Sequence, residues 1–508
     1  MRVLLINVPI RESDLPRNFP IGLGIIAQLL EDNGYEVVVV DINAHRYQRD
    51  EVLKVLEGIG PVDVVGVSGL ISTYRYQKWL FPQLQHIFPK AFLVAGGGCV
   101  TSVPALMMEH ITEIDVGVIG EGEQTILELL QAVREGAGFD AVQGIAYRNT
   151  DGCRITEKRL GLADISALPM PAYRLFPTEI YAQNPIWLPH NDRIKRSMNV
   201  LSSRGCPMDC NFCYHLFGRR SFRQRSVESV MAEVRFLKEN YAVDFIAFVD
   251  DNMTVNKAFL LEFCEQIKKV KILWGCHGRV DCADDQRLAA MARAGCKWLG
   301  FGIESGSQKI LDRMNKHVTV ACARQAIART LAHGIYPNAT YIYGYPGEDI
   351  YSIRDTIKFQ MEVHHCRPCF YATPYPGTPL YEQSRARGLI KDEEAYILSL
   401  NDASDFTINL TTMNDAEFSR LYYRMYNETK LMEDITLYRH GVDDEKRFLS
   451  NCKALLSVPV LVDEMKAKVL KKLAVYFLND KKLSREAAVY SAQAQKFQEQ
   501  RLTQEVFR

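Results

Sequence analysis

Short apolar runs alternate with amphipathic segments through the first 145 residues of the chain. Runs rich in valine, leucine and isoleucine are typical of buried parallel strands. Five are predicted here: Val3–Asn7, Glu36–Asp41, Val64–Gly69, Phe92–Gly97 and Val116–Gly120. Helical spacing lies between them, at Ile25, Ile26, Leu29 and Leu30, and over Tyr74–Gln85, Pro104–His110 and Gln124–Arg134. This alternation predicts an α/β protein that opens with a doubly wound, Rossmann-like parallel sheet, whose ligands bind outside the strands' carboxyl ends.

The pattern changes between residues 146 and 195, where five prolines fall close together and indicate a linker. It returns over residues 196–395. The expected strands there are Asn199–Ser203, Phe245–Asp250, Ile272–Cys276, Trp298–Ile303, Ala339–Gly344 and Phe370–Thr373. The expected helices are Val227–Asn240, Phe259–Lys268, Gln286–Ala294, Ala321–His333 and Tyr351–His364. Six β-α units predict a partial parallel barrel with its site at the strands' carboxyl ends, because a full barrel takes eight.

The remaining residues, 396–508, show no comparable strand pattern. Charged amphipathic segments there predict a helical C-terminal region, at Ala416–Lys430, Leu461–Leu478 and Ser484–Arg501. The expected organisation is therefore a Rossmann-like domain over 1–145, a Pro-rich linker over 146–195, a partial barrel over 196–395 and a helical domain over 396–508.

Composition narrows the class of protein. The 508 residues carry 61 Lys and Arg against 61 Asp and Glu, so there is no net charge to attract nucleic acid. The chain contains no run of about 18 apolar residues, so we expect no membrane span. The first residues do not have the pattern of a signal peptide. We therefore expect a cytoplasmic protein whose 13 cysteines are reduced.

Three cysteines form the strongest chemical signal. Cys206, Cys210 and Cys213 follow a predicted strand in a glycine-containing loop, with spacings of three and two residues between them. A structural zinc site uses four ligands, often as two Cys-x-x-Cys pairs, and no second pair lies nearby. Three thiolates instead suit a four-iron, four-sulfur cluster with one iron left open.

This motif resembles that of the radical S-adenosylmethionine (SAM) superfamily, Cys-x3-Cys-x-aromatic-Cys, with Phe212 at the aromatic position. The resemblance implies that the open iron of a [4Fe-4S] cluster binds SAM, whose cleavage gives a 5′-deoxyadenosyl radical. It also implies SAM contacts from the ends of later strands and from two cations. The corresponding residues are Phe212, Asp250, Arg279, Glu304, Ser305, Lys316 and Gly344. The Gly-Gly-Glu often found after the family's second strand is replaced by Asp250-Asp251-Asn252.

The N-terminal half resembles the cobalamin-binding domain that precedes the radical SAM domain in one large subfamily. Small residues near the strands' carboxyl ends carry this resemblance, and they would let a flat corrin approach the backbone. The implied cobalamin contacts are Ser68, Gly97, Gly98, Cys99, Gly120, Glu121 and Gly122. The Asp-x-His-x-x-Gly motif that supplies histidine to cobalt is absent, so cobalamin is expected base-off without a histidine ligand. Cys99 stands where many relatives have histidine; a thiol there could approach the corrin, but a small buried core residue is the favoured interpretation of it.

A dinucleotide fingerprint competes for the same segment, since Gly22, Gly24 and Ala27 are followed by Asp41. The fingerprint needs its first glycine at the turn after the first strand, and Gly22 comes over a dozen residues later. A cobalamin site is therefore the favoured interpretation of this half.

The expected activity is methylation of an unactivated carbon of a small molecule by a cobalamin-dependent radical SAM enzyme. An oxidative cyclisation or ring rearrangement without methyl transfer is the alternative, as in the anaerobic magnesium-protoporphyrin monomethyl ester cyclase that the chain also resembles. An RNA methylthiotransferase is a distant third. Those relatives carry additional cluster cysteines in the N-terminal domain, whereas Cys99 is the only cysteine in the first 145 residues here. The resemblance also implies a reductant such as flavodoxin or ferredoxin.

Overall fold

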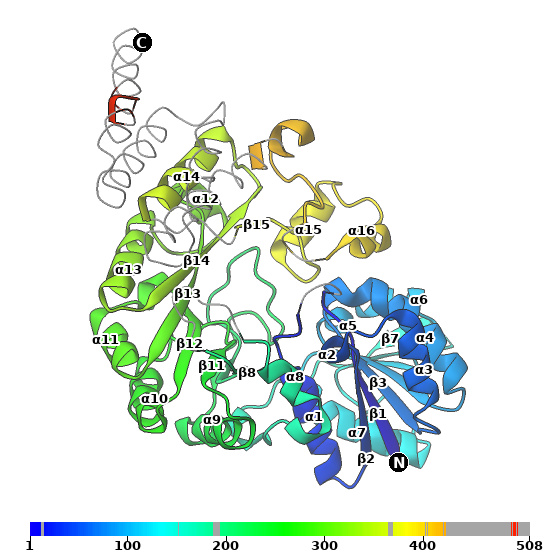
Figure 1. The fold of residues 1–508 in the computed structure, drawn as a ribbon. Helices are drawn as coiled ribbons and strands as arrows, with labels where there is room; N and C mark the ends of the chain where they lie inside the picture. Colours follow the sequence, from blue (N-terminus) through cyan, green and yellow to red (C-terminus); the bar gives the residue numbers. More distant parts are fainter. Residues whose placement is uncertain are drawn as a thin grey trace.

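The computed structural model describes residues 1–422 except 12–14, 151, 186–193, 364–368, 402, 404 and 420, together with residues 489, 491–493 and 495. Two sheets dominate this part of the chain, each covered by helices (Figure 1). The mixed α/β class predicted from the sequence is confirmed. The helices expected over residues 461–478 and 484–501 lie wholly or almost wholly outside the described residues.

The N-terminal sheet has the order β2-β1-β3-β4-β5-β6-β7. Its strands are β1 (Arg2–Asn7), β2 (Glu36–Asp41), β3 (Val64–Ser68), β4 (Phe92–Gly96), β5 (Val116–Val118), β6 (Ile145–Asn149) and β7 (Gly152–Ile155). Its helices are α1 (Ile21–Asp32), α2 (Ile42–His45), α3 (Arg49–Glu57), α4 (Tyr74–Ile87), α5 (Gly98–Ser102), α6 (Pro104–His110) and α7 (Glu123–Glu135). The first five strands run parallel, as predicted, because their apolar residues are buried on both faces by these helices.

The sheet extends past residue 145, where the sequence indicated a linker. Strands β6 and β7 form an antiparallel hairpin on the edge strand β5. All four residues of β7 are exposed, so this strand shows no apolar run by which it could be recognised.

The proline-rich segment after β7 is docked rather than merely wrapped around the surface. It carries α8 (Thr178–Ala182) and buries aromatic side chains against the start of α1. The ring of Phe19 lies 4.7 Å from that of Tyr173 and 5.0 Å from that of Phe176, centroid to centroid. The hydroxyl of Tyr181 donates to Asp41, 2.8 Å away. Asp41 therefore has protein partners, which removes it as the ribose ligand of a dinucleotide site.

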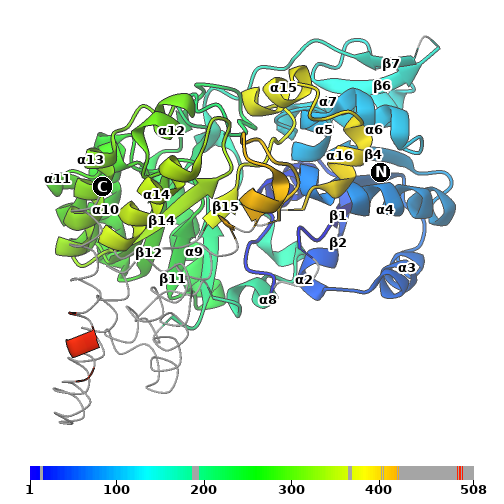
Figure 2. The same ribbon diagram turned by 90° about the horizontal axis from the view of Figure 1, so that it is seen from above.

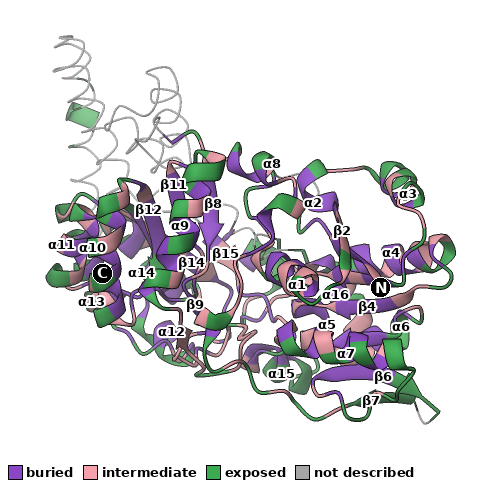
Figure 3. Ribbon diagram, turned by 90° about the horizontal axis from the view of Figure 1, so that it is seen from below, coloured by how far each residue is buried: buried purple, intermediate pink, exposed green. Residues whose placement is uncertain are grey.

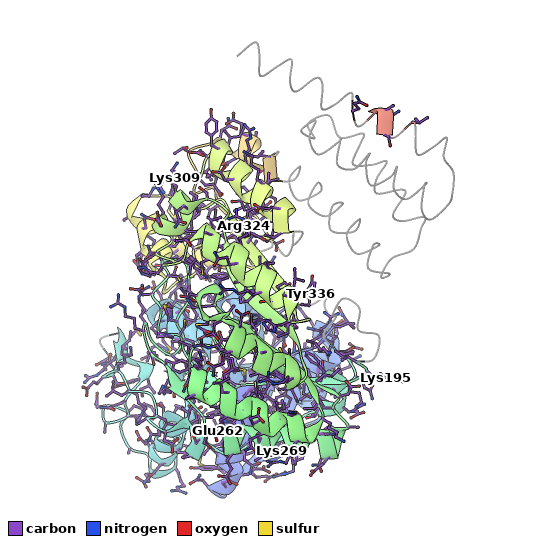
Figure 4. The ribbon with its side chains drawn as sticks, turned by 90° about the vertical axis from the view of Figure 1, so that its left-hand side faces the viewer. Lys195, Glu262, Lys269, Lys309, Arg324 and Tyr336 are labelled. Carbon is purple, nitrogen blue, oxygen red and sulfur yellow. The ribbon has the colours of Figure 1, made fainter. Side chains whose placement is uncertain are left out.

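The second sheet is a six-stranded parallel half-barrel with the order β15-β14-β13-β12-β11-β8, as predicted. Its strands are β8 (Ser197–Val200), β11 (Phe245–Phe248), β12 (Leu273–Gly278), β13 (Cys296–Glu304), β14 (Tyr336–Tyr343) and β15 (Cys369–Tyr371). Its helices are α9 (Val227–Tyr241), α10 (Lys257–Val270), α11 (Asp285–Arg293), α12 (Gln308–Arg313), α13 (Val320–Ala332) and α14 (Ile350–Val363). These helices cover the outer face, and charged side chains such as Glu262 and Arg324 lie on it (Figure 4).

The chain then returns to the N-terminal domain. Helix α15 (Pro379–Ala386) leaves the barrel, and α16 (Glu393–Ser399) packs beside α4 (Figure 2). The carboxylate of Glu394 accepts a hydrogen bond from Tyr74 (2.8 Å) and pairs with Lys78 and His110. One hydrophobic cluster joins the N-terminal core to Tyr396 and Ile397 of α16. In the barrel, strands β8 and β11 are buried along their whole length (Figure 3). Among the described residues, no helix is both long and apolar enough to cross a bilayer.

Candidate active site

The three cysteines lie in a loop over residues 205–222, the cysteine loop, whose two ends are paired as short antiparallel strands. These strands are β9 (Ser203–Arg204) and β10 (Arg223–Gln224). Gly205 makes the tight entry possible: its φ is +82°, and a Cβ there would lie 2.2 Å from the Ser221 carbonyl oxygen. The glycine before the first cysteine is therefore required by a positive φ and by a close backbone approach.

The cysteine loop presents three free thiols to one another. Cys210 is buried, and it interacts electrostatically with both Cys206 and Cys213. Partial desolvation raises the pKa of the Cys206 and Cys213 thiols, that of Cys213 to about 12. A structural zinc site uses four ligands, whereas three thiolates suit a four-iron, four-sulfur cluster, in which each sulfur binds a different iron and one iron is left open.

Asp209, between the first two cysteines, fastens the cysteine loop to the barrel. Its Oδ1 accepts a hydrogen bond from Asn315 Nδ2 (3.0 Å), and His317 Nε2 lies 3.5 Å away. Its Oδ2 pairs with Arg220. The Arg220 guanidinium holds the pKa of Asp209 below its usual value. The loop is thus crosslinked to the segment after α12 and to its own far end.

A buried cation lies next to the cysteines. Lys316 Nζ is 2.8 Å from Glu304 Oε1 and 5.6 Å from the centre of the Phe212 ring. Arg279 Nη2 donates to the Lys316 carbonyl oxygen at 3.1 Å. Burial lowers the pKa of Lys316, but the Glu304 and Cys210 charges outweigh it and the net shift is upward, so this ammonium stays charged. A ligand carboxylate could be neutralised here.

Three predicted SAM contacts lie in the protein interior instead. Asp250 is buried and accepts hydrogen bonds from Ser202 and Ser203. Ser305 Oγ is 3.0 Å from Thr356 Oγ1 and accepts from a backbone amide. Gly344 (φ +86°) is covered by the ring of Phe418, 2.7 Å from where a Cβ would stand. These three residues shape the strand ends, while Phe212, Arg279, Glu304 and Lys316 gather around the cysteines.

A cavity of about 360 Å³ lies between the two domains. It opens at the carboxyl ends of β1, β3, β4 and β5, and its other wall is Leu201, Arg204, Leu216 and Phe217 from the barrel side. Six predicted cobalamin contacts line it: Ser68, Gly97, Gly98, Gly120, Glu121 and Gly122. The cysteine loop itself therefore forms part of this interdomain cavity.

Two glycines show why small residues are needed in the cavity wall. Gly97 has φ +83°, and a Cβ there would lie 2.8 Å from the Gly69 carbonyl oxygen. Gly120 has φ +79°, but a Cβ there would meet no heavy atom within 4 Å. A side chain at Gly97 is excluded by the backbone, whereas one at Gly120 would occupy open space in the cavity.

An apolar slot extends from the cavity into the N-terminal domain. It runs between the sheet and helices α1 and α7, and its walls are Leu5, Leu23, Ile26, Val94, Val118 and Ile126. Base-off cobalamin would place its flat corrin over the glycines and its nucleotide tail in this slot. No histidine is among the described residues that line the cavity. The residues present therefore fit cobalamin held without a histidine ligand.

Cys99 does not reach the cavity. Its side chain is completely buried, and its Sγ lies 3.4 Å from Met107 Sδ. Burial raises the pKa of this thiol far above its ordinary range. In the structure Cys99, in the first turn of α5, is a core residue of the hydrophobic cluster that also holds Val67 and Met107.

Sequence reasoning missed a set of buried charges at the domain boundary, which we call the interdomain ion network: Glu121, Glu123, Arg204 and Arg223. Arg204 Nη1 lies 2.8 Å from Glu121 Oε2, and its Nη2 pairs with Glu123. Arg223 also pairs with Glu121. The available signal was the position of two arginines at the ends of the cysteine loop and two glutamates at a strand's carboxyl end.

Comparison with known proteins agrees with this geometry. Residues 13–130 match the family model of the B12 binding domain, and residues 200–359 match that of the Radical SAM superfamily. An uncharacterized methyltransferase from Pyrococcus horikoshii is 30% identical over 402 residues, which cover 77% of this chain and 84% of that protein. The anaerobic magnesium-protoporphyrin IX monomethyl ester cyclase of Rubrivivax gelatinosus is 28% identical, over 78% of this chain and 72% of the cyclase.

A solved structure has a similar fold. The cobalamin-dependent S-adenosylmethionine radical enzyme OxsB with aqua-cobalamin bound superposes with a TM-score of 0.67. The match is 14% identical and covers 98% of this chain and 83% of OxsB. The matches to the two family models make a [4Fe-4S] cluster, SAM and cobalamin the cofactors of this protein. The chain belongs to the radical SAM superfamily, in the group whose members carry a B12-binding domain before the radical SAM domain.

Proposed function

We propose that this enzyme methylates an unactivated carbon of a small molecule. One observation carries the proposal: residues of the cysteine loop, Leu216 and Phe217, form a wall of the cavity that fits cobalamin. Both cofactors can then act on a substrate held between them. When bound, the cluster and SAM supply a hydrogen-abstracting 5′-deoxyadenosyl radical, and cobalamin supplies a methyl group.

Cys206, Cys210 and Cys213 would hold three irons of the cluster and leave the fourth to SAM. The cation of Lys316, charged because Glu304 pairs with it, would orient the SAM carboxylate. Arg279 would hold Lys316 through its backbone oxygen. Phe212, whose ring lies beside this cation, would shield the pair from water and so strengthen it.

The N-terminal domain would position the second cofactor. Gly97, Gly98 and Gly120 expose backbone on which a corrin can lie, and Ser68 offers a hydroxyl at the slot entrance. A methyltransferase for cytidylyl-2-hydroxyethylphosphonate from Streptomyces wedmorensis is 27% identical over 78% of this chain and 83% of its own length. That relationship supports methyl transfer to a small molecule here.

The similarity to magnesium-protoporphyrin cyclases favours a second candidate, radical oxidation or cyclisation without methyl transfer. The two activities leave different products from SAM. Methylation yields both S-adenosylhomocysteine and 5′-deoxyadenosine, whereas cyclisation yields 5′-deoxyadenosine without S-adenosylhomocysteine.

The test uses cluster-loaded protein with hydroxocobalamin, a low-potential reductant, SAM with a deuterated methyl group and a fraction of small metabolites. We expect both SAM products and a metabolite that gains the labelled methyl. Release of 5′-deoxyadenosine alone would favour the cyclase-like activity. We further propose that flavodoxin or ferredoxin is the natural reductant and that the enzyme acts in the cytoplasm, where thiols stay reduced.

A further inference from the structure

The base of the cysteine loop contains two like charges that face each other. In the β9–β10 pair Arg204 is the direct cross-strand partner of Arg223. Like charges directly opposite each other destabilise an antiparallel pair. The side chains of Arg204 and Arg223 are only 5% and 15% exposed, so water screens this repulsion poorly. The two-residue strands therefore need anions from elsewhere to stay paired.

Those anions come from the N-terminal domain. Glu121 accepts hydrogen bonds from both arginines, at 2.8 Å from Arg204 Nη1 and 3.0 Å from Arg223 Nη1. Glu123 pairs with the other nitrogen of Arg204. Burial alone would raise the pKa of Glu121, but the two guanidinium groups outweigh it and hold that pKa below its usual range. The closed base of the cysteine loop thus depends on carboxylates of the cobalamin-binding domain.

The same two carboxylates line the interdomain cavity. The hydrogen bonding of the Glu123 carboxylate is incomplete there, because its Oε2 is buried and has no hydrogen-bond partner among the described residues. An unsatisfied buried carboxylate oxygen is costly, and a neutral N–H or O–H donor in the cavity would relieve that cost. Cobalamin carries many such donors on its amide side chains and its ribose.

The end of the three-cysteine segment also reaches the cavity wall. Tyr214 follows the last cysteine, and its hydroxyl donates to the Gly98 carbonyl oxygen at 3.3 Å. Gly98 lines the cavity. Both ends of the three-cysteine segment are therefore attached to loops that contact the cobalamin-shaped space.

We propose that Glu121 and Glu123 are positioning residues that couple cobalamin binding to closure of the cysteine loop. Cobalamin in the cavity completes the hydrogen bonding of Glu123 and fixes its contact with Arg204, which holds β9 against β10. By linkage, the same coupling makes cobalamin bind more tightly when the loop is closed around its cluster. This inference rests on the proposed binding of cobalamin, but not on which reaction follows.

Trypsin cleavage within the cysteine loop tests the coupling. Arg219 and Arg220 are exposed there, and cleavage after them reports opening of the loop. Cluster-loaded protein is treated anaerobically with and without saturating hydroxocobalamin, and the cleaved fragments are quantified by mass spectrometry. The variants are Glu121→Gln and Glu123→Gln. Glu262→Gln, the same change on the exposed outer face of α10 (Figure 4), is the matched control.

We expect hydroxocobalamin to slow cleavage about 10-fold in the parent and in Glu262→Gln, within the usual range of allosteric coupling. In the two network variants the slowing should fall below about twofold, although both still bind hydroxocobalamin by its spectral change. Equal slowing in parent and variants overturns the proposal, as does cobalamin binding that leaves parental cleavage unchanged. Failure of the parent to bind hydroxocobalamin would instead remove the proposed function, and this inference with it.

Discussion

Gly120→Ala should weaken cobalamin binding by filling the cavity rather than by unfolding the domain. Gly120 and Gly136 form a matched pair, with φ values of +79° and +64° and no heavy atom within 4 Å of an added Cβ. Alanine in this left-handed region costs about 1–2 kcal/mol at either position. Gly136, however, ends α7 on the exposed surface, whereas Gly120 lines the interdomain cavity.

The two substitutions should therefore lower the free energy of unfolding equally and differ only in ligand binding. A methyl group forced into a well-packed contact costs about 1–3 kcal/mol, which is roughly 5- to 150-fold in the dissociation constant. The assay is titration of hydroxocobalamin followed by absorbance, with urea unfolding of both variants alongside. If Gly136→Ala weakened binding as much as Gly120→Ala, transmitted strain would explain the effect. If Gly120→Ala bound hydroxocobalamin like the parent, Gly120 would not lie against the cofactor.

Three further predictions concern the barrel and the domain boundary. Cys210→Ala should abolish the cluster, seen as loss of bound iron and of its electron paramagnetic resonance signal, whereas the exposed Cys153→Ser should retain both. Lys316→Met should weaken SAM binding in calorimetric titration by at least 10-fold, because the SAM carboxylate loses its proposed cation and the buried Glu304 carboxylate is left unpaired beside it. Lys309→Met, which breaks a half-exposed ion pair (Figure 4), should not weaken it. The lowered pKa of Glu121 makes its contribution to stability complete above the ordinary glutamate pKa of about 4.3 and lost as pH falls through the lowered value. Acid unfolding should thus become shallower in Glu121→Gln, and an unchanged acid limb would contradict this.

The sequence predicted the strands of the two parallel sheets, because most of these strands carry runs of apolar residues. It missed the hairpin β6–β7, whose outer strand is wholly exposed, and the pair β9–β10, which is two residues long on each side. Pairing over so few residues depends on contacts with other elements rather than on local pattern.

In the candidate site, too, local sequence patterns were predictive and contacts between distant residues were not. Motifs located the ends of the strands correctly, and the cysteine spacing indicated the chemistry. They could not tell whether a polar side chain at a strand end faces the ligand or the protein interior. Asp250 and Ser305 are buried in the interior. Nor could the motifs show that Arg204 and Glu123 meet, because these residues are 81 positions apart in the chain.

The return of α16 to the N-terminal domain has a consequence for how a large cofactor leaves. The polypeptide joins the two halves once through the proline-rich segment and again through α15 and α16, where Glu394 binds Tyr74 and Lys78. Together with the interdomain ion network, these contacts oppose separation of the two halves. Release of bound cobalamin therefore requires the α16 contacts to break as well, and we expect replacement of Glu394 to shorten its residence time.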